Sequence, residues 1–211
     1  MVIRILIADD HPVVRQGIRL IISSAGDIVV AAEASDGREL LEAARTIPHD
    51  VVLLDLSMPA TDGLDLLKQL KRERPKTPIL ILTMSPEDQF AIRALKAGAA
   101  GYLMKESAPP ELVSAIRRVM AGGRYLTPRV AEKLADHLAS DSERPLHEML
   151  SDREYQVMRM IAAGKPTRQI ATELALSVKT LGTYRARIFE KMRMKSPAEL
   201  AAYVVRNGIS E

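Results

Sequence analysis

The chain has 211 residues and a mass of 23.2 kDa, enough for one large domain or two ordinary ones. It contains no Cys, which excludes disulfides, thiolate nucleophiles and cysteine-ligated zinc. No run approaches the ~18 apolar residues that a membrane span needs. The first residues do not combine a basic segment with a long apolar stretch, as a secretion signal does. We therefore expect a cytoplasmic protein with no membrane partner.

Charge is divided unevenly along the chain, whose formal net charge is +3. Residues 148–211 hold 11 Lys and Arg against 7 acidic residues, whereas the residues before them hold 19 against 20. A near-neutral front part and a basic tail indicate separate tasks, with the tail facing a polyanion.

The first part of the chain, to about residue 124, alternates β-branched runs with stretches of helical periodicity. Strands are predicted at 3–8, 28–33, 50–55, 78–83 and 101–104, and helices at 12–25, 37–46, 63–73, 87–97 and 109–122. Asp36 with Glu39, and Ser85 before Pro86, are helix-start signals. This alternation predicts an α/β fold, with a doubly wound five-stranded parallel sheet covered by helices on both faces.

Beyond residue 124 the strand signals stop. A helix-compatible piece, Arg129–Leu138, leads into a polar stretch, 139–145, that is typical of a flexible link. Four helices are predicted after it, at 152–163, 168–175, 178–193 and 197–206. We therefore predict three parts: a domain over 1–124, a linker with a helix over 125–147, and a second, all-α four-helix domain over 148–211.

Three carboxylates lie at the carboxyl ends of two predicted strands. Asp9 and Asp10 follow strand 3–8, and Asp55 ends strand 50–55. If these strands are parallel neighbours, the acids meet at the carboxyl edge of the sheet, where α/β folds bind ligands. Like charges so close repel, so a cation must hold the cluster, and oxygen ligands suit Mg²⁺. The alternative is three solvated aspartates at strand ends.

Two further residues fall at the same edge, because Thr83 ends the fourth strand and Lys105 follows the fifth. A phosphoryl group on a carboxylate has three oxygens whose charge must be met. A metal, a hydroxyl and an ammonium can each meet one. The set predicts a phosphoryl site with a carboxylate nucleophile. We read His11, beside the acids, as a helix-start residue, with a metal ligand or proton shuttle as the alternative.

The segment 178–193 predicts an amphipathic helix with a cationic face. Its apolar side holds Leu181, Ile188 and Met192, and its other side holds Lys179, Thr183 and Arg187. A short helix precedes it across a tight turn, Leu176-Ser177, in which Ser177 can cap. Two helices that meet at such a turn form a helix-turn-helix, whose second helix enters the major groove of DNA. The alternative is a solvated surface helix.

The motifs of the first domain resemble those of the receiver domain of bacterial response regulators. They are Ile7-Ala8-Asp9-Asp10-His11, the run from Leu54-Asp55 to Asp62-Gly63, Leu82-Thr83-Met84, and Gly101-Tyr102-Leu103-Met104-Lys105. The resemblance implies a flavodoxin-like fold in which Asp55 is the phosphoacceptor. It implies these further roles: Mg²⁺ held by Asp9, Asp10, Asp55 and the Ser57 backbone carbonyl, phosphoryl oxygens bound by Thr83 and Lys105, and Tyr102 as a side chain that changes rotamer on activation. Many receivers have Pro after the lysine, whereas Glu106 follows here.

The tail resembles the LuxR-type DNA-binding domain, on the motifs Leu150-Ser151-Asp152-Arg153-Glu154, Ile170-Ala171, Lys179-Thr180-Leu181 and Lys191-Met192. With the receiver, the whole chain resembles a NarL/FixJ-type response regulator. The resemblance places Lys179, Thr180, Tyr184, Arg185, Arg187 and Lys191 at the phosphate backbone, and Gly182, Thr183 and Ala186 at the bases. Gly182 departs from the polar or basic residue common at its position, and it costs the helix roughly 1 kcal/mol against Ala.

The resulting hypothesis is a transcription regulator rather than an enzyme. A partner histidine kinase phosphorylates Asp55, and the active form binds double-stranded DNA as a homodimer. One alternative is a metal-dependent phosphatase with an aspartate nucleophile, but Ser57 stands where such enzymes need an acid. Another is an orphan regulator that binds DNA without phosphorylation.

Overall fold

The computed structural model describes residues 2–58, 63–84, 89–106, 108–139, 145–174 and 176–209. Its backbone contacts divide the chain into two units, Met1–Leu134 and Ala135–Glu211. None of the helices in the described ranges is long and apolar enough to cross a membrane. The three-part division with limits at residues 124 and 148 stays a prediction.

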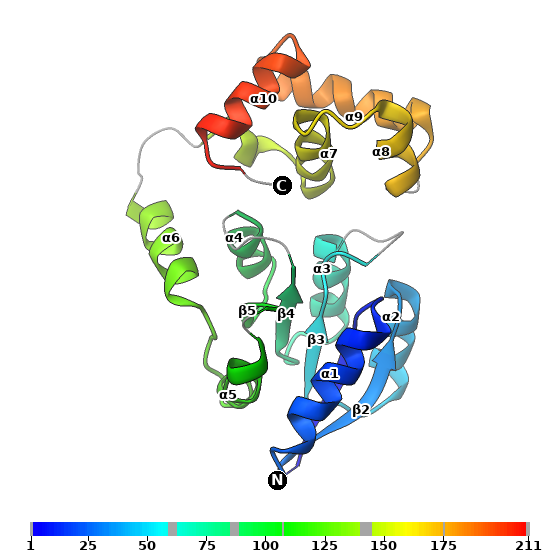
Figure 1. Cartoon of the computed structure of the whole chain (residues 1–211), viewed down its shortest axis with the longest axis vertical. Helices are drawn as coiled ribbons and strands as arrows, with labels where there is room; N and C mark the ends of the chain where they lie inside the picture. Colours follow the sequence, from blue (N-terminus) through cyan, green and yellow to red (C-terminus); the bar gives the residue numbers. More distant parts are fainter. Residues whose placement is uncertain are drawn as a thin grey trace. The chain divides into compact units, whose positions relative to one another are not determined.

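The N-terminal unit is built on a five-stranded parallel sheet. Its strands are β1 (Ile3–Ala8), β2 (Ile28–Ala34), β3 (Val51–Leu54), β4 (Ile79–Thr83) and β5 (Gly101–Met104). They lie in the order β2-β1-β3-β4-β5, and each neighbouring pair is parallel (Figure 1). This is a doubly wound order of the flavodoxin type, so the predicted fold class is confirmed.

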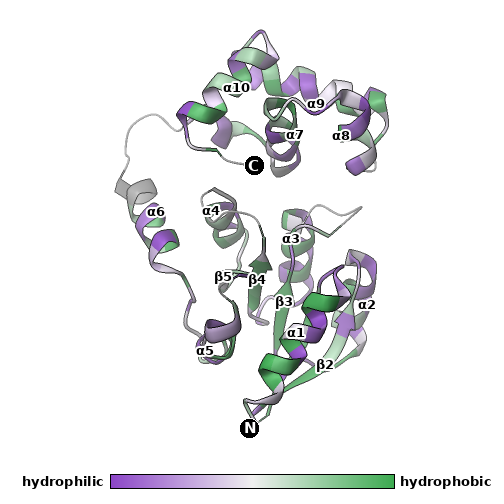
Figure 2. Ribbon diagram, viewed as in Figure 1, coloured by the Kyte–Doolittle hydropathy of each residue, from purple (hydrophilic) through white to green (hydrophobic). Residues whose placement is uncertain are grey.

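Five helices cover the two faces of this sheet: α1 (Pro12–Ser23), α2 (Gly37–Thr46), α3 (Gly63–Glu73), α4 (Gln89–Lys96) and α5 (Ala108–Met120). Successive strand residues point to opposite faces, which splits β1 between two cores. Leu6 and Ala8 belong to the core under α2, α3 and α4, whereas Ile5 and Ile7 belong to the core under α1 and α5. Because β3 and β4 are buried on both faces, they are hydrophobic along their length (Figure 2).

The strand register brings the ends of four strands to one edge. Ala8 of β1 pairs with Leu54 of β3, and Thr83 of β4 pairs with Met104 of β5. The residues that follow these strands therefore leave the sheet side by side. This edge is the one where a crossover fold of this kind binds its ligand.

After α5 the chain returns to the outer side of β5. The Tyr125 N–H donates to the Ala100 carbonyl at 3.1 Å, and the Tyr102 N–H donates to the Tyr125 carbonyl at 3.1 Å. Tyr125 thus makes a parallel bridge with Gly101 before helix α6 (Pro128–Ala139) begins. The sequence did not predict this bridge, because a single paired residue has no periodicity.

The C-terminal unit is helical. It contains a 3-10 helix, η1 (Leu146–Met149), and four helices: α7 (Asp152–Ala162), α8 (Thr167–Glu173), α9 (Val178–Lys191) and α10 (Pro197–Arg206). Sequence periodicity predicted the four helices but not η1, which is shorter than two turns. The predicted helix 178–193 ends at Lys191 instead, because Arg193 has a left-handed φ of 52° that closes the helix.

Helix starts in both units follow the capping signals. Ser151 and Glu154 form a complete capping box at α7. Asp36 caps α2, but the Glu39 carboxylate accepts the Ser35 N–H at 2.7 Å, one residue before the predicted partner. The predicted start at Ser85-Pro86 lies outside the described residues.

We predict that Gly101→Ala destabilises the N-terminal unit by about 2 kcal/mol, a value typical of overpacking. A Cβ at this position would lie 2.7 Å from the Tyr125 carbonyl oxygen and 2.8 Å from a Leu80 methyl carbon. The matched control is Gly17→Ala on α1, where a Cβ meets no atom within 4 Å. It should gain up to about 1 kcal/mol from helix propensity. Urea unfolding measures both, and equal midpoints would contradict the prediction.

We predict that Glu154 stabilises the C-terminal unit at neutral pH and not in acid. Burial by itself raises the pKa of Glu154, but hydrogen bonds from Lys191 and Ser151 outweigh it and lower the pKa below its ordinary value of 4.5. A lowered pKa adds stability above the ordinary value and loses it as pH falls through the folded-state pKa. Glu154→Gln should therefore cost roughly 1–2 kcal/mol at pH 7.

Calorimetric unfolding between pH 7 and pH 3 checks this, because the difference from wild type should shrink as the pH falls. Glu190→Gln, a change at an exposed carboxylate on the same helix as Lys191, is the control and should follow wild type throughout. A difference for Glu154→Gln that is constant with pH would count against the ionic contribution.

Candidate functional site

A cluster of acids and one lysine lies at the carboxyl edge of the sheet. The Lys105 ammonium is 2.6 Å from Asp55 Oδ2 and 2.7 Å from Asp9 Oδ2. Both carboxylates are buried, and Lys105 itself has a side-chain exposure of only 6%. The ammonium thus compensates two carboxylates that would otherwise repel each other in a place that water hardly reaches.

Backbone hydrogen bonds place these residues as they leave their strands. The Asp55 N–H donates to the Ala8 carbonyl at 2.9 Å, and the Lys105 N–H donates to the Thr83 carbonyl at 2.9 Å. The Asp9 N–H in turn donates to the Ala34 carbonyl at 3.1 Å. The sheet therefore continues by one residue beyond the ends of β1, β3 and β5, and the side chains start from fixed points.

Each buried carboxylate is also held by the backbone two residues later. The Ser57 N–H donates to Asp55 Oδ1 at 2.9 Å, and the His11 N–H donates to Asp9 Oδ1 at 2.9 Å. This local bond is the one that Asp side chains favour at turns. It fixes one oxygen of each acid and leaves the other, Oδ2, facing Lys105.

The cluster has the donor set that a hard cation needs. Ligand atoms of Asp9, Asp10, His11 and Asp55 all lie within 4.8 Å of one another. Among the described residues, Asp9 Oδ2 and Asp10 Oδ1 are buried oxygens that accept no hydrogen bond of good geometry. Oxygens with unused lone pairs in an acidic group suit Mg²⁺. The residues present therefore fit a magnesium ion.

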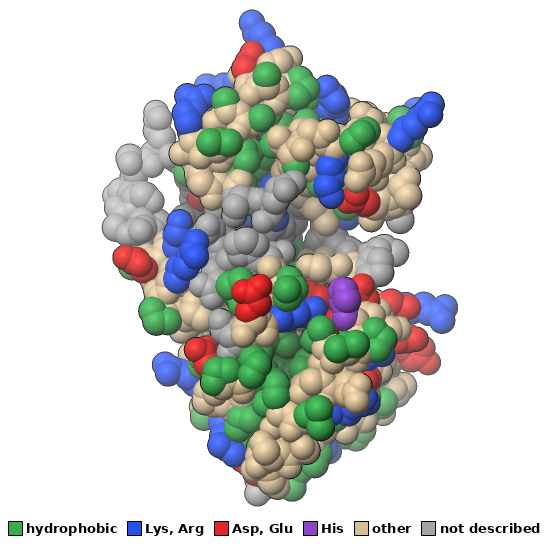
Figure 3. Space-filling view, in the orientation of Figure 1, with side chains coloured by type: hydrophobic (Ala, Val, Ile, Leu, Met, Phe, Trp, Pro, Cys, Tyr) green, Lys and Arg blue, Asp and Glu red, His purple; other side chains and the backbone are tan. Residues whose placement is uncertain are grey.

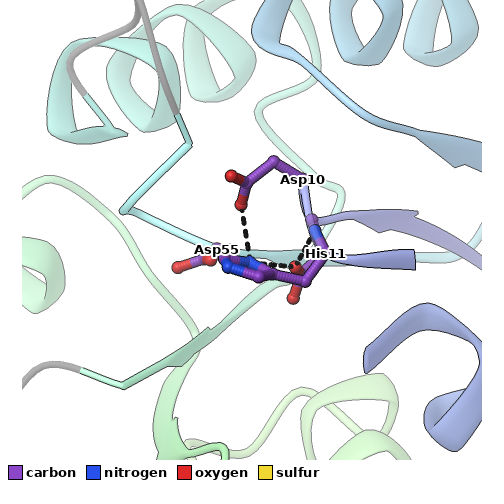
Figure 4. A group of neighbouring side chains, drawn as sticks. Asp10, His11 and Asp55 are labelled. Carbon is purple, nitrogen blue, oxygen red and sulfur yellow. Dashed lines mark hydrogen bonds and ion pairs between the residues drawn. The ribbon is translucent and has the colours of Figure 1, made fainter. Parts of the chain in front are cut away.

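His11 is in contact with the acids of this cluster. It is the N-cap residue of α1, with no side-chain capping bond, in line with the reading as a helix-start residue. Its Nδ1 is nevertheless 2.9 Å from Asp10 Oδ1 and 3.3 Å from Asp9 Oδ1, and Figure 4 shows the first of these contacts. The ring is largely exposed, so it flanks the acids from the solvent side.

The charge state of Lys105 follows from its surroundings. Burial alone lowers the pKa of Lys105, but hydrogen bonds and charges from Asp55 and Asp9 outweigh it, so the pKa lies above its ordinary value. The ammonium therefore stays protonated at neutral pH. A fixed positive charge at this point attracts an anionic group that approaches Asp55.

The two remaining residues predicted for this site lie on its neighbouring strands. Thr83 is the last residue of β4 and is fully buried. Tyr102 is fully buried on β5, three residues before Lys105, in the core under α4. Parts of the predicted motif after Asp55, residues 59–62, lie outside the described residues.

The structure also adds a contact that the sequence did not predict. Arg15 on α1 donates from Nη1 to the Asp9 carbonyl at 2.6 Å. The helical pattern around Arg15 does not predict this contact, because β1 and α1 come together only when the unit folds.

The second predicted site lies on helix α9, which follows α8 in the helix-turn-helix. Ser177 caps α9, since its Oγ accepts the Thr180 N–H at 3.0 Å. Leu181 and Ile188 are buried on one side of α9. Six of the nine residues predicted to contact DNA are exposed: Lys179, Thr180, Gly182, Thr183, Ala186 and Arg187. Lys and Arg side chains project from the drawn face of the unit that contains α7–α10 (Figure 3).

The other three predicted DNA contacts are partly buried. The Arg185 guanidinium lies over the Phe189 ring, 5.4 Å from its centre, and Tyr184 precedes it. The Lys191 ammonium forms an ion pair of 2.5 Å with Glu154 of α7. Lys191 therefore ties α9 to α7, and 39% of its side chain remains exposed.

Two family models match the chain. The model described as "Response regulator receiver domain" matches residues 5–117, and the model described as "Bacterial regulatory proteins, luxR family" matches residues 148–204. Response regulator GacA of Pseudomonas viridiflava is 40% identical over 208 residues, which cover 98% of this chain and 97% of that protein. Response regulator UvrY of Escherichia coli K12 is 38% identical over 208 residues, which cover 98% of this chain and 95% of that protein.

A solved structure agrees with these matches. RcsB of Salmonella enterica serovar Typhimurium, bound to promoter rprA in the presence of the phosphomimetic BeF3-, aligns with a TM-score of 0.69 and 27% identity. The alignment covers 97% of this chain and 99% of that one. Together with the acidic site and the helix-turn-helix, these matches establish the family. The chain belongs to the NarL/FixJ-type response regulators, two-component regulators of transcription that join a receiver domain to a LuxR-type DNA-binding domain.

Proposed function

We propose that Asp55 accepts a phosphoryl group from a partner histidine kinase, and that this step controls DNA binding. The observation that carries the proposal is the ion pair of 2.6 Å between Lys105 and Asp55, beside two further acids. A buried carboxylate with a fixed cation next to it is a nucleophile whose product, an acyl phosphate, already has a charge partner. The kinase supplies the phosphoryl group.

Mg²⁺ belongs to this proposal as the resident cofactor, held by Asp9, Asp10, Asp55 and the Ser57 backbone carbonyl. When bound, it supplies positive charge for the oxygens of the incoming phosphoryl group. The protein's own part is to fix the nucleophile. The Ser57 N–H holds Asp55 Oδ1, so Oδ2 is the oxygen that faces Lys105 and attacks. Thr83 and Lys105 then bind oxygens of the phosphoryl group.

The signal leaves the site along β4 and β5. Thr83 ends β4, Tyr102 lies on β5, and Lys105 follows directly after β5. A shift of Thr83 and Lys105 toward a phosphoryl group therefore acts on these two strands and on the core that contains Tyr102. Tyr102 changes rotamer in response. This biases a two-state equilibrium toward the form that binds DNA as a homodimer.

DNA is bound by the exposed face of α9. Lys179, Arg187 and their neighbours Thr180, Tyr184 and Arg185 contact phosphates, and Lys191 does so while it also holds Glu154. Thr183, Ala186 and Gly182 face the bases. RcsB, which aligns over nearly the whole chain, is a protein bound to a promoter in its structure. A chromosomal target requires a cytoplasmic location in a bacterium.

We predict that acetyl phosphate with Mg²⁺ phosphorylates the wild-type chain and not Asp55→Asn, because the amide cannot attack phosphorus. The matched control is Asp50→Asn, the same chemical change at an acid that is paired with Arg4 before β3 begins. Phosphate-affinity electrophoresis should show wild-type labelling for the control. Labelling of Asp55→Asn would refute the site. If labelling is normal but DNA affinity is the same with and without donor, the orphan alternative replaces phosphorylation control.

We predict that Lys179→Ala and Arg187→Ala each weaken binding to every duplex tested. Each removes one phosphate contact, so the slope of log affinity against log salt should become shallower by about 1. Thr183→Ala should instead change the preference among sequences. Arg206→Ala on α10 is the control and should keep the wild-type slope. Fluorescence anisotropy at several salt concentrations checks these outcomes, and unchanged slopes for both α9 variants would remove α9 from the interface.

A further inference from the structure

Arg15 connects the metal-site end of β1 to strand β2. Its Nη1 donates to the Asp9 carbonyl at 2.6 Å, and its Nε donates to Glu33 Oε2 at 2.9 Å. The side chains of Arg15 and Glu33 are 17% and 25% exposed, so the pair is mostly shielded from water. A planar guanidinium that bonds two partners through different nitrogens has a fixed orientation.

The Asp9 carbonyl is part of the peptide group that links Asp9 to Asp10. Because a peptide group is planar and rigid, a bond to its carbonyl oxygen fixes the whole plane, including the start of Asp10. These two residues carry two of the proposed metal-binding carboxylates. The Asp9 N–H already donates to Ala34, and the Asp9 carboxylate is held by His11 and Lys105. Arg15 holds the remaining polar group of Asp9, its backbone carbonyl.

Glu33 gives Arg15 its orientation and balances its charge. Glu33 pairs with Ile7 in the β1–β2 register, which places it near the carboxyl end of β1. Its second oxygen forms an ion pair with Arg19, one turn along α1. Arg19 therefore shares the Glu33 partner, but its Nη1 donates to Glu33 and not to the Asp9 carbonyl.

We propose that Arg15, oriented by Glu33, is a positioning residue that sets the peptide plane between Asp9 and Asp10 and thereby the affinity of the acidic site for Mg²⁺. The inference rests on the proposed magnesium site. It assigns a function to an α1 residue and a β2 residue, neither of which is among the residues proposed to hold the metal or the phosphoryl group.

A purely electrostatic role makes different predictions from a positioning role. If only charge matters, removal of the Arg15 cation strengthens Mg²⁺ binding, and removal of the Glu33 anion weakens it. If position matters, both removals weaken it, since both release the same peptide plane. Arg15→Lys separates the two most sharply. It keeps the charge, but a single ammonium cannot replace a fork that spans Asp9 and Glu33.

The experiment is a titration of the unphosphorylated full-length chain with Mg²⁺ alone, followed by amide NMR shifts. We expect Arg15→Ala and Arg15→Lys to raise the dissociation constant about 10-fold, the lower end for residues that orient metal ligands. Glu33→Ala should also raise it, and Glu33→Gln, which keeps an oxygen acceptor for Arg15, should recover most of the loss. Arg19→Ala is the matched control and should bind Mg²⁺ as wild type does.

A second readout separates positioning from loss of fold. Phosphorylation of Arg15→Lys by acetyl phosphate should reach the wild-type rate at saturating Mg²⁺, with the midpoint moved to higher concentration. Wild-type dissociation constants for both Arg15 variants, or tighter binding by Arg15→Ala, overturn the inference while the proposed function stands. If the wild-type chain does not bind Mg²⁺, the proposed magnesium site fails and the inference fails with it.

Discussion

The repulsion between buried carboxylates at one edge of the sheet is the constraint on which the rest of the receiver depends. Asp9 and Asp55 are fixed by strands that continue one residue past their ends, so they cannot separate. Lys105 compensates both charges at 2.6–2.7 Å. The proposed metal ion and phosphoryl group would each replace part of the charge compensation that Lys105 now provides.

Strand β5, which leads into Lys105, connects this edge of the sheet to the rest of the chain. Lys105 follows the last residue of β5, Tyr102 lies on β5 within the core, and the outer side of β5 pairs with Tyr125. Tyr125 also donates its hydroxyl to Glu111 of α5 at 2.5 Å, so the segment that leads into α6 is tied to both β5 and α5. Helix α6 therefore begins three residues after a residue that is hydrogen-bonded to both β5 and α5.

The elements were predictable because their signals are local. Apolar runs and capping pairs such as Ser151 with Glu154 depend on residues a few positions apart, and the four predicted C-terminal helices are present. Contacts between distant segments gave no such signal. Three contacts of this kind each join residues 18 or more positions apart: the bridge of Tyr125 with Gly101, the Arg15–Glu33 pair and the Lys191–Glu154 ion pair.

The sequence by itself determined the class of fold and the identity of the acidic cluster, because strand ends in a parallel sheet share an edge whichever way the loops run. Only the tertiary structure decided how each carboxylate is held. The backbone N–H groups of Ser57 and His11 select one oxygen of each acid, and the strand register brings the other to Lys105. Direction of a side chain depends on packing across the sheet, and a linear pattern of residue types does not contain that information.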